Sequence, residues 1–360
     1  MYNVISANRS PKKANKNWRI FEQKNLKNHF GPILNVNGED SHSVLDAYLK
    51  HKDTIKYIRW YPDPEKMTNA EYQGMLNQSK QIGNIPYITS SPEGFICVQN
   101  KEKAFEIWKQ NNINCPDYFV YRNKEDFYVQ QEKHKIEVPF LVRVNNGVGG
   151  HNTFVVRDEN QISKALDKMD SDFKNYKKFG VRIKTLKICV KLIDSIDRDM
   201  AVNVSYRVHV AGNKVVSGYA RVVPESEWCA ITAGKFNIKQ IDNWIYFNKK
   251  CESLIKEREK EICKSVHVLK LNHQGVDIVV DQNDNLCFLE VQPTYAAGYP
   301  IKMGRYCPPY YNPYDENLVK FLQENKNELK KEIPTYYKNW LDKNNHFNLV
   351  YKYLKEYIDG

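Results

Sequence analysis

The sequence predicts a protein of mixed α/β and α+β class that is divided into several subdomains. Near the start of the chain, short β-forming runs alternate with helical stretches, which favours a largely parallel sheet. Farther along, pairs of β-forming runs are joined by turn-forming residues, which favours antiparallel hairpins. The chain has 360 residues, of which 41% are hydrophobic, and this is enough for two or three separate cores.

The first unit, residues 1–90, carries the alternation of strands and helices. It contains no glycine-rich phosphate-binding fingerprint, so no dinucleotide site is predicted there. Its first 30 residues are basic, and such a segment is more often a solvated surface than a binding site. The expected strands are 32–36, 54–60 and 85–88, and the expected helices are 43–50 and 69–81.

The second unit, residues 91–190, combines a helix with a glycine-rich hairpin. Asn100 is a suitable N-cap for the helix. The hairpin loop holds Gly147, Gly149 and Gly150, and glycines of this kind let the backbone close over a phosphate chain. A purely structural hairpin turn is an equally good interpretation of the loop taken alone. The helix is expected over 100–109 and the hairpin strands over 138–144 and 153–156.

The third unit, residues 191–312, contains two arginines inside β-forming runs. Gly212 and Asn213 predict the turn between these runs. Arg207 and Arg221 each need an anionic partner within a strand, and a phosphate or a carboxylate is a natural one. A surface ion pair is the alternative for either arginine. The runs cover 204–211 and 214–221, and a further helix is expected over 250–270.

A second hairpin in this unit, with strands at 274–280 and 286–293, predicts a metal site. Asp277 and Glu290 each interrupt an apolar strand, and Gln292 lies two residues beyond Glu290 on the same face. Three oxygen ligands on one patch suit a hard cation such as Mg²⁺ that also holds nucleotide phosphates. An edge hairpin with carboxylates in water is the alternative, but the apolar neighbours favour burial, and buried carboxylates need partners.

Composition narrows the class of protein. The eight cysteines include no C-x-x-C pair, so neither a disulfide framework nor a structural zinc site is expected. No run of about 18 apolar residues occurs and the N-terminus has no apolar signal core, so we expect a cytoplasmic protein without a membrane span. The net charge of +11 suits contact with a polyanion, and equally suits an enzyme that uses ATP and acidic substrates.

Taken in order over about residues 90–300, these motifs resemble the ATP-grasp superfamily. Within it, the sequence is most similar to the ribosomal-protein glutamate ligases and glutathione-synthetase-like carboxylate–amine ligases. The resemblance implies an ATP-grasp fold, in which an N-terminal α/β domain precedes two α+β subdomains that clasp ATP. The implied parts are an N-terminal domain on the substrate side (1–90), a small lid subdomain (91–190), a catalytic subdomain (191–312) and a C-terminal helical extension (313–360). The C-terminal extension is expected to form two helices that are separated near Pro334.

The resemblance also implies roles for single residues. Arg143 stands where the family usually has a lysine and keeps the positive charge, Lys191 replaces an acid at the adenine hinge, and Gln292 replaces an asparagine but keeps its carbonyl oxygen. The implied nucleotide-binding residues are Lys101, Arg143, Gly147, Gly149, Gly150, Val190, Lys191, Leu192 and Ile193; the implied catalytic residues are Arg207 and Arg221; the implied metal ligands are Asp277, Glu290 and Gln292.

The function implied by the resemblance is ATP-dependent ligation of a carboxylate to an amine through an acyl phosphate, with release of ADP and phosphate. The expected cofactors are ATP and Mg²⁺, with Mn²⁺ as the alternative ion, and the expected partners are a small-molecule or peptide carboxylate and an amine acceptor. Two alternatives stay open: a small-molecule kinase of the same fold, and a degenerate nucleotide- or nucleic-acid-binding module, which the charge and Lys191 would suit. A homo-oligomer is also left open.

Overall fold

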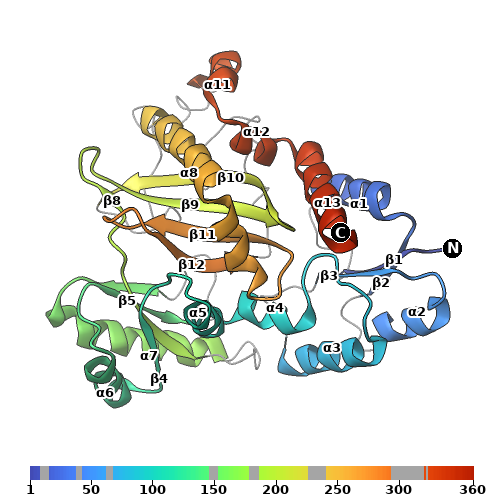
Figure 1. The fold of residues 1–360 in the computed structure, drawn as a ribbon. Coiled ribbons are helices and arrows are strands. Elements are labelled where there is room, and N and C mark those ends of the chain that lie inside the picture. Colours follow the sequence, from blue (N-terminus) through green and yellow to red (C-terminus); the bar gives the residue numbers. More distant parts are fainter. Residues whose placement is uncertain are drawn as a thin grey trace.

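A computed structural model describes residues 1–8, 16–37, 43–61, 68–145, 153–177, 186–225, 241–292, 320–321 and 323–360. The fold is mixed α/β, as predicted, and the described strands form three sheets (Figure 1). No helix in this described part is long and apolar enough to cross a membrane.

The first sheet has strand order β2-β1-β3, and all of its pairs are parallel, as the alternating pattern predicts. The first strand and the first helix of this unit, residues 4–8 and 16–30, were not predicted. The first strand lies in the segment expected to be a solvated basic surface, yet its Val4 and Ile5 are completely buried. The strands are β1 (Val4–Asn8), β2 (Ile33–Asn37) and β3 (Tyr57–Tyr61), and the helices are α1 (Lys16–Phe30), α2 (Ser43–His51) and α3 (Asn69–Ile82).

The second sheet is antiparallel and has strand order β4-β7-β5-β6. The apolar face of this sheet packs on α6 and α7, chiefly through Phe127, Ile162 and Leu166. Two helices, α4 and α5, lead into it. The elements are α4 (Pro92–Gln99), α5 (Lys101–Gln110), β4 (Tyr118–Tyr121), α6 (Lys124–His134), β5 (Phe140–Val144), β6 (Thr153–Val156), a 3-10 turn (Glu159–Gln161), α7 (Ile162–Lys177) and β7 (Lys187–Lys191).

The third sheet is antiparallel, with strand order β10-β9-β11-β12 and β8 paired to β9, and α8 runs across one of its faces (Figure 1). The helix lies close because Gly218 has no side chain: a Cβ there would come within 2.7 Å of Ile255 Cδ1. The elements are β8 (Ile196–Asp197), β9 (Val202–Ala211), β10 (Lys214–Pro224), α8 (Ile241–His267), β11 (His273–Val280) and β12 (Leu286–Gln292). The helix that the sequence predicts over 250–270 is α8, which begins nine residues earlier, at Ile241.

The C-terminal extension joins the first sheet to the third. The expectation of two helices is wrong for the described residues, which form α11 (Lys326–Glu332), α12 (Thr335–Leu341) and α13 (Lys343–Asp359). Pro334 lies at the first break, as predicted, and the Asp342 carboxylate causes the second by accepting hydrogen bonds from the first backbone amides of α13. Helix α13 lies beside α1 (Figure 1), and Phe347 and Leu354 share a core with Val4 and Phe30.

Candidate functional site

The candidate site begins as a row of charged side chains across one face of the third sheet. Asp277 on β11 lies directly opposite Arg207 on β9 and Glu290 on β12. Arg221 on β10 lies two residues from Tyr219, the register partner of Arg207, so it shares this face. The sheet thus brings together four charged residues that are up to 83 positions apart, as the single-face interpretation of the hairpin requires.

A β-bulge sets the direction of Glu290. In the β11–β12 pair, Asp277 opposes Glu290 but Ile278 opposes Phe288, so Leu289 is an extra residue on β12. Without it, Phe288 and Glu290 would point to the same face, because side chains alternate along a strand. The bulge lets Phe288 enter the core while Glu290 faces Asp277.

Asp277 is held by both arginines. Its Oδ1 and Oδ2 each lie 2.6 Å from a nitrogen of Arg207, Nε and Nη2 respectively, and Arg221 Nη2 lies 2.5 Å from Oδ1. Burial raises the pKa of the Asp277 carboxyl, but the two guanidinium groups outweigh it and hold that pKa well below its usual range. The anion that the arginines in these strands require is therefore, in this structure, a buried carboxylate of the protein itself.

Glu290 is held by cations from α5 and β5. Lys101 Nζ lies 3.0 Å from Glu290 Oε2, and Arg143 Nη2 lies 3.8 Å from the same oxygen. The Gln292 amide donates to the other oxygen, Oε1. Burial and the neighbouring Arg143 charge lower the pKa of Lys101 to about 8, although Glu290 acts in the opposite direction. The predicted residues of α5, β5 and β12 thus meet at one carboxylate.

The position of Lys101 is fixed by two asparagines at the start of α5. The Asn100 side chain caps the helix by accepting from the Lys103 backbone amide. Asn145, at the end of β5, donates to the Asn100 side chain and accepts from the Glu102 amide. Asn145 was not predicted as a site residue. Its position, directly after the strand that carries Arg143, is the feature of the sequence that could have identified it. These contacts lock the start of α5 to the strand that carries Arg143.

The predicted adenine hinge, Val190–Ile193, lies at the end of β7, where two backbone amides already donate hydrogen bonds. The Lys191 amide donates to the Asp117 carbonyl at 2.8 Å, and the Leu192 amide donates to the Pro139 carbonyl at 3.1 Å. The Lys191 ammonium lies 3.4 Å from the Glu137 carbonyl at an exposed position. Adenine binding at Val190–Ile193 remains a prediction, and it depends on the other backbone groups of this segment.

Two predicted parts lie outside the described residues. Gly147, Gly149 and Gly150 fall in the gap at 146–152. The segment 293–312, which follows the predicted metal ligands, is also outside them.

The donor set of the third sheet fits a hard divalent cation. Asp277 and Glu290 oppose each other on one face, Gln292 adds an amide group, and Glu290 Oε2 is buried and in ionic contact with Lys101 and Arg143. Among the residues that the structure describes, no third His, Cys, Asp or Glu joins this group. Two carboxylates are what Mg²⁺ takes from a protein when substrate phosphates and water complete its coordination.

The site carries more positive than negative charge. Four cations, Lys101, Arg143, Arg207 and Arg221, surround two carboxylates, and all six side chains are at most 16% exposed. Cations in a poorly hydrated site attract anions more strongly than they would in water. The arrangement is therefore suited to bind a polyanion such as a nucleoside triphosphate.

The chain is similar to several known proteins. The RimK-like ATP-grasp domain matches residues 98–297. The carbamoyl phosphate synthase large chain of Bifidobacterium longum is 28% identical over 88 residues, which are 24% of this chain and 8% of that protein. Among solved structures, D-alanine–D-alanine ligase from Bacillus anthracis has a TM-score of 0.48 and 12% identity, with coverage of 98% of this chain and 99% of that chain. A RimK domain ATP-grasp protein from Sphaerobacter thermophilus has a TM-score of 0.47 and 9% identity, with coverage of 80% and 90%.

Proposed function

The chain belongs to the RimK-like ATP-grasp family, and we propose that it uses ATP to join a carboxylate to an amine, with release of ADP and phosphate. The observation that carries this proposal is the buried group of four cations around two carboxylates, where the second and third sheets meet. Such a site can gather the phosphates of ATP and a substrate carboxylate, which repel each other in solution.

Lys101 and Arg143 are the residues that we propose to hold the nucleotide phosphates. Both lie beside Glu290, and both are nearly buried, so a phosphate oxygen would meet them with little competing water. Asp277, Glu290 and Gln292 would hold Mg²⁺ or Mn²⁺. A bound divalent ion would neutralise charge on the phosphate oxygens during transfer.

Arg221 is the residue that we propose to bind the substrate carboxylate or the transferred phosphate. Its Nη2 contacts Asp277, but its Nε is buried and has no hydrogen-bond partner among the described residues. An unpaired buried donor is costly, and an incoming anion would satisfy it. Arg207 uses two nitrogens on Asp277, so we propose that it orients the site through that carboxylate.

The proposed reaction has two steps. The substrate carboxylate attacks the γ-phosphorus and ADP leaves, which gives an acyl phosphate; the amine then attacks the acyl carbon and phosphate leaves. The cations lower the repulsion between the two anions in the first step. Exclusion of water protects the acyl phosphate from hydrolysis until the amine arrives.

A screen of ADP release with the full chain tests this function. Candidate carboxylates and amines, including amino acids, peptides and polyamines, are supplied in pairs with Mg-ATP. We expect ADP release that requires both members of one pair, together with an amide product detected by mass spectrometry. ADP release with a phosphorylated product and no amide would support the kinase instead. Nucleic-acid binding with no ATP turnover would contradict both the ligase and the kinase hypotheses.

ATP binding is expected to require a divalent cation. Without one, the phosphates would meet the buried carboxylates of Asp277 and Glu290, both of which remain charged because their pKa values are lowered in the site. Titration calorimetry with ATP in excess Mg²⁺ and in excess chelator measures the difference. Equal affinity under the two conditions would contradict the metal assignment.

Two substitutions of Arg143 test whether ATP binding depends on the charge of this side chain or on its shape. Arg143→Ala is expected to weaken ATP binding about tenfold, roughly 1.4 kcal/mol, because a nearly buried cation is lost. Arg143→Lys keeps the charge and is expected to bind ATP nearly as well as the parent. Arg258→Ala on α8 is a control for the loss of an arginine that pairs instead with Glu261. If both Arg143 variants bind ATP like the parent, Arg143 does not contact the nucleotide.

A further inference from the structure

The carboxylate oxygens of the predicted metal site are in contact with cations of the chain itself. Arg207 binds both oxygens of Asp277 through Nε and Nη2, each at 2.6 Å, and Arg221 Nη2 lies 2.5 Å from Oδ1. Glu290 Oε2 lies 3.0 Å from Lys101 Nζ. A divalent ion that binds these two carboxylates must therefore compete with the protein's own cations for their oxygens.

The partner of Glu290 differs in origin from the partners of Asp277. Arg207 and Arg221 lie on strands of the same sheet as Asp277, so strand pairing fixes them relative to one another. Lys101 reaches Glu290 from the first turn of α5, outside this sheet. A lysine ammonium is a point charge on a flexible stem, so it can turn from a carboxylate to a phosphate. Of these three cations, Lys101 is therefore the most easily exchanged.

Lys101 and a divalent ion cannot both be held favourably at Glu290 Oε2. The side chains of Lys101 and Glu290 are only 9% and 16% exposed, so little water screens the repulsion between two cations at one oxygen. Arg143 Nη2, 3.8 Å from the same oxygen, adds a further positive charge. The phosphates of a nucleotide carry more negative charge than one carboxylate, and they would attract Lys101 away from Glu290. The oxygen would then be available to the ion.

We propose that Lys101 is an internal counter-ion that blocks Glu290 Oε2 to divalent ions until nucleotide phosphates bind the lysine. The protein then takes up the ion together with the nucleotide and not alone. The inference rests on the proposed assignment of Glu290 as a metal ligand, and it adds the order in which the contacts change. Because coupling between two ligands is reciprocal, the nucleotide and the ion increase each other's affinity by the same factor.

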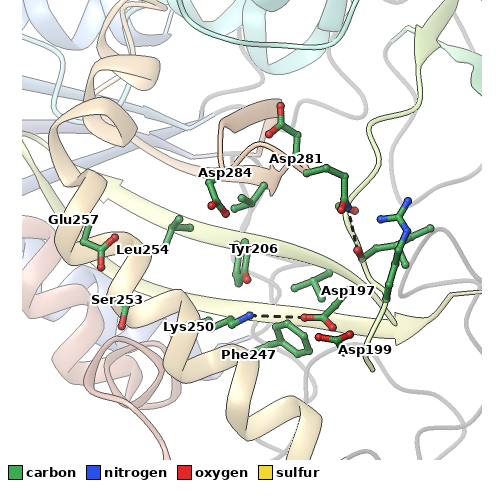
Figure 2. Close-up of a pocket in the computed structure, with 16 residues that line it drawn as sticks. Asp197, Asp199, Tyr206, Phe247, Lys250, Ser253, Leu254, Glu257, Asp281 and Asp284 are labelled. Atoms are coloured by element: carbon green, nitrogen blue, oxygen red, sulfur yellow. Dashed lines mark hydrogen bonds and ion pairs between the residues drawn. The ribbon is translucent and has the colours of Figure 1, made fainter. Parts of the chain in front are cut away.

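A pocket on the other face of the third sheet is the alternative location for a divalent ion. Tyr206 lines it and is the chain neighbour of Arg207, so the two side chains point to opposite faces of β9. Five acidic residues line the pocket; one of them, Asp197, contacts Lys250 at 3.7 Å (Figure 2), and another, Asp284, is exposed on the β11–β12 turn. An ion bound there would not depend on the contact between α5 and β12, and this difference separates the two locations.

Binding of Mn²⁺ to the full chain, measured from the electron paramagnetic resonance signal of the free ion, tests the proposal. For the parent we expect weak binding without nucleotide, and at least about tenfold tighter binding with a non-hydrolysable ATP analogue. Lys101→Met keeps the length of the side chain but removes its charge. Without nucleotide, it should bind Mn²⁺ at least about tenfold more tightly than the parent. In saturating Mg²⁺, it should bind the ATP analogue more weakly. A side chain that only maintains the fold would not shift the two affinities in opposite directions.

Three control variants locate the effect. Lys103→Met removes a charge from the same helix, where the ammonium is 37% exposed and pairs with Glu106, and it should bind Mn²⁺ like the parent. Lys101→Met/Glu290→Gln should lose the gain in Mn²⁺ affinity, because the carboxylate that Lys101 releases is no longer charged. Lys101→Met/Asp284→Asn, which alters the pocket on the other face, should keep the gain.

Three results would overturn the proposal. The first is a Mn²⁺ affinity of Lys101→Met that does not exceed that of the parent. The second is an equal gain in Lys103→Met, which would indicate a general effect of net charge. The third is a gain that persists without the Glu290 charge or disappears in the Asp284 variant. If Lys101→Met does not melt cooperatively, Arg143→Met takes its place under the same criteria, with a smaller gain because Arg143 Nη2 lies farther from Oε2, at 3.8 Å.

The same measurements distinguish this inference from the proposed function. Failure of the parent to bind the ATP analogue would contradict the proposed function. A gain in Mn²⁺ affinity in Lys101→Met that depends on Glu290 would still support the contact between Lys101 and the metal site, because that measurement requires neither nucleotide nor ligase activity.

Discussion

Glu290→Gln is expected to slow ADP formation by at least about a hundredfold, roughly 2.7 kcal/mol of lost transition-state stabilisation. The amide keeps the size of the side chain but removes the charge that meets Lys101 and Arg143. If Glu290 helps to hold a divalent ion against the phosphates, this charge matters most during transfer. Steady-state ADP release with the substrate pair found by screening is the measurement.

Stability is the main confounding effect for this variant. A neutral amide leaves Lys101 and Arg143 buried without a carboxylate, which can lower stability independently of catalysis. Thermal melts with and without Mg-ATP should therefore accompany the kinetics, and Glu125→Gln serves as the matched exposed control. A Glu290→Gln protein that melts like the parent and turns over ATP at the parental rate would refute the proposed role of Glu290.

Asp277→Asn is expected to destabilise the folded protein by about 3–5 kcal/mol. The Asp277 side chain is 9% exposed, and its carboxylate compensates two guanidinium groups at 2.5 and 2.6 Å. Its removal leaves Arg207 and Arg221 buried with no full negative charge in contact. Urea unfolding followed by circular dichroism measures the change in the free energy of unfolding, provided that the dependence on urea is the same for both proteins.

An exposed ion pair provides the comparison. Asp167→Asn breaks the pair with Lys124 at 2.9 Å, where the Asp167 side chain is 65% exposed, and should change the free energy of unfolding far less than Asp277→Asn does. Equal effects of the two substitutions would show that the buried cluster does not stabilise the fold.

The contribution of the Asp277 charge to the free energy of unfolding also depends on pH. In the parent protein it is complete above a pH of about 3.9, the pKa of an aspartate in the unfolded chain. It is lost as the pH falls toward the lower pKa that Asp277 has in the folded protein.

Local patterns were sufficient for several parts of this protein. Alternation along 286–292 placed Glu290 and Gln292 on one face, and the observed register, in which they oppose Asp277 and Gly275, confirms it. The β9–β10 hairpin was predicted from Gly212 and Asn213 at its turn, and Gly212 has the positive φ, 53°, that such a turn uses. These features depend on a few neighbouring residues, so the sequence alone determines them.

Other elements depend on packing against distant parts of the chain. The first strand, β1, and helix α1 were not predicted, because their apolar residues are few and their segment is basic; burial against α13, some 300 residues later, stabilises them. Helix α6 was missed because its sequence has almost no amphipathic pattern and only Phe127 is buried. Propensity and periodicity are weak where tertiary contacts supply most of the stability.

The sequence by itself determined the motifs that resemble the family, the charged residues and the face that Glu290 shares with Gln292. Only the tertiary structure decided which charges meet: Asp277 with Arg207 and Arg221, and Glu290 with Lys101, 189 positions away. It also decided, through the bulge at Leu289, that Glu290 faces the site while Phe288 enters the core. Strand order, register and bulges follow from burial across the whole sheet, which no local pattern encodes.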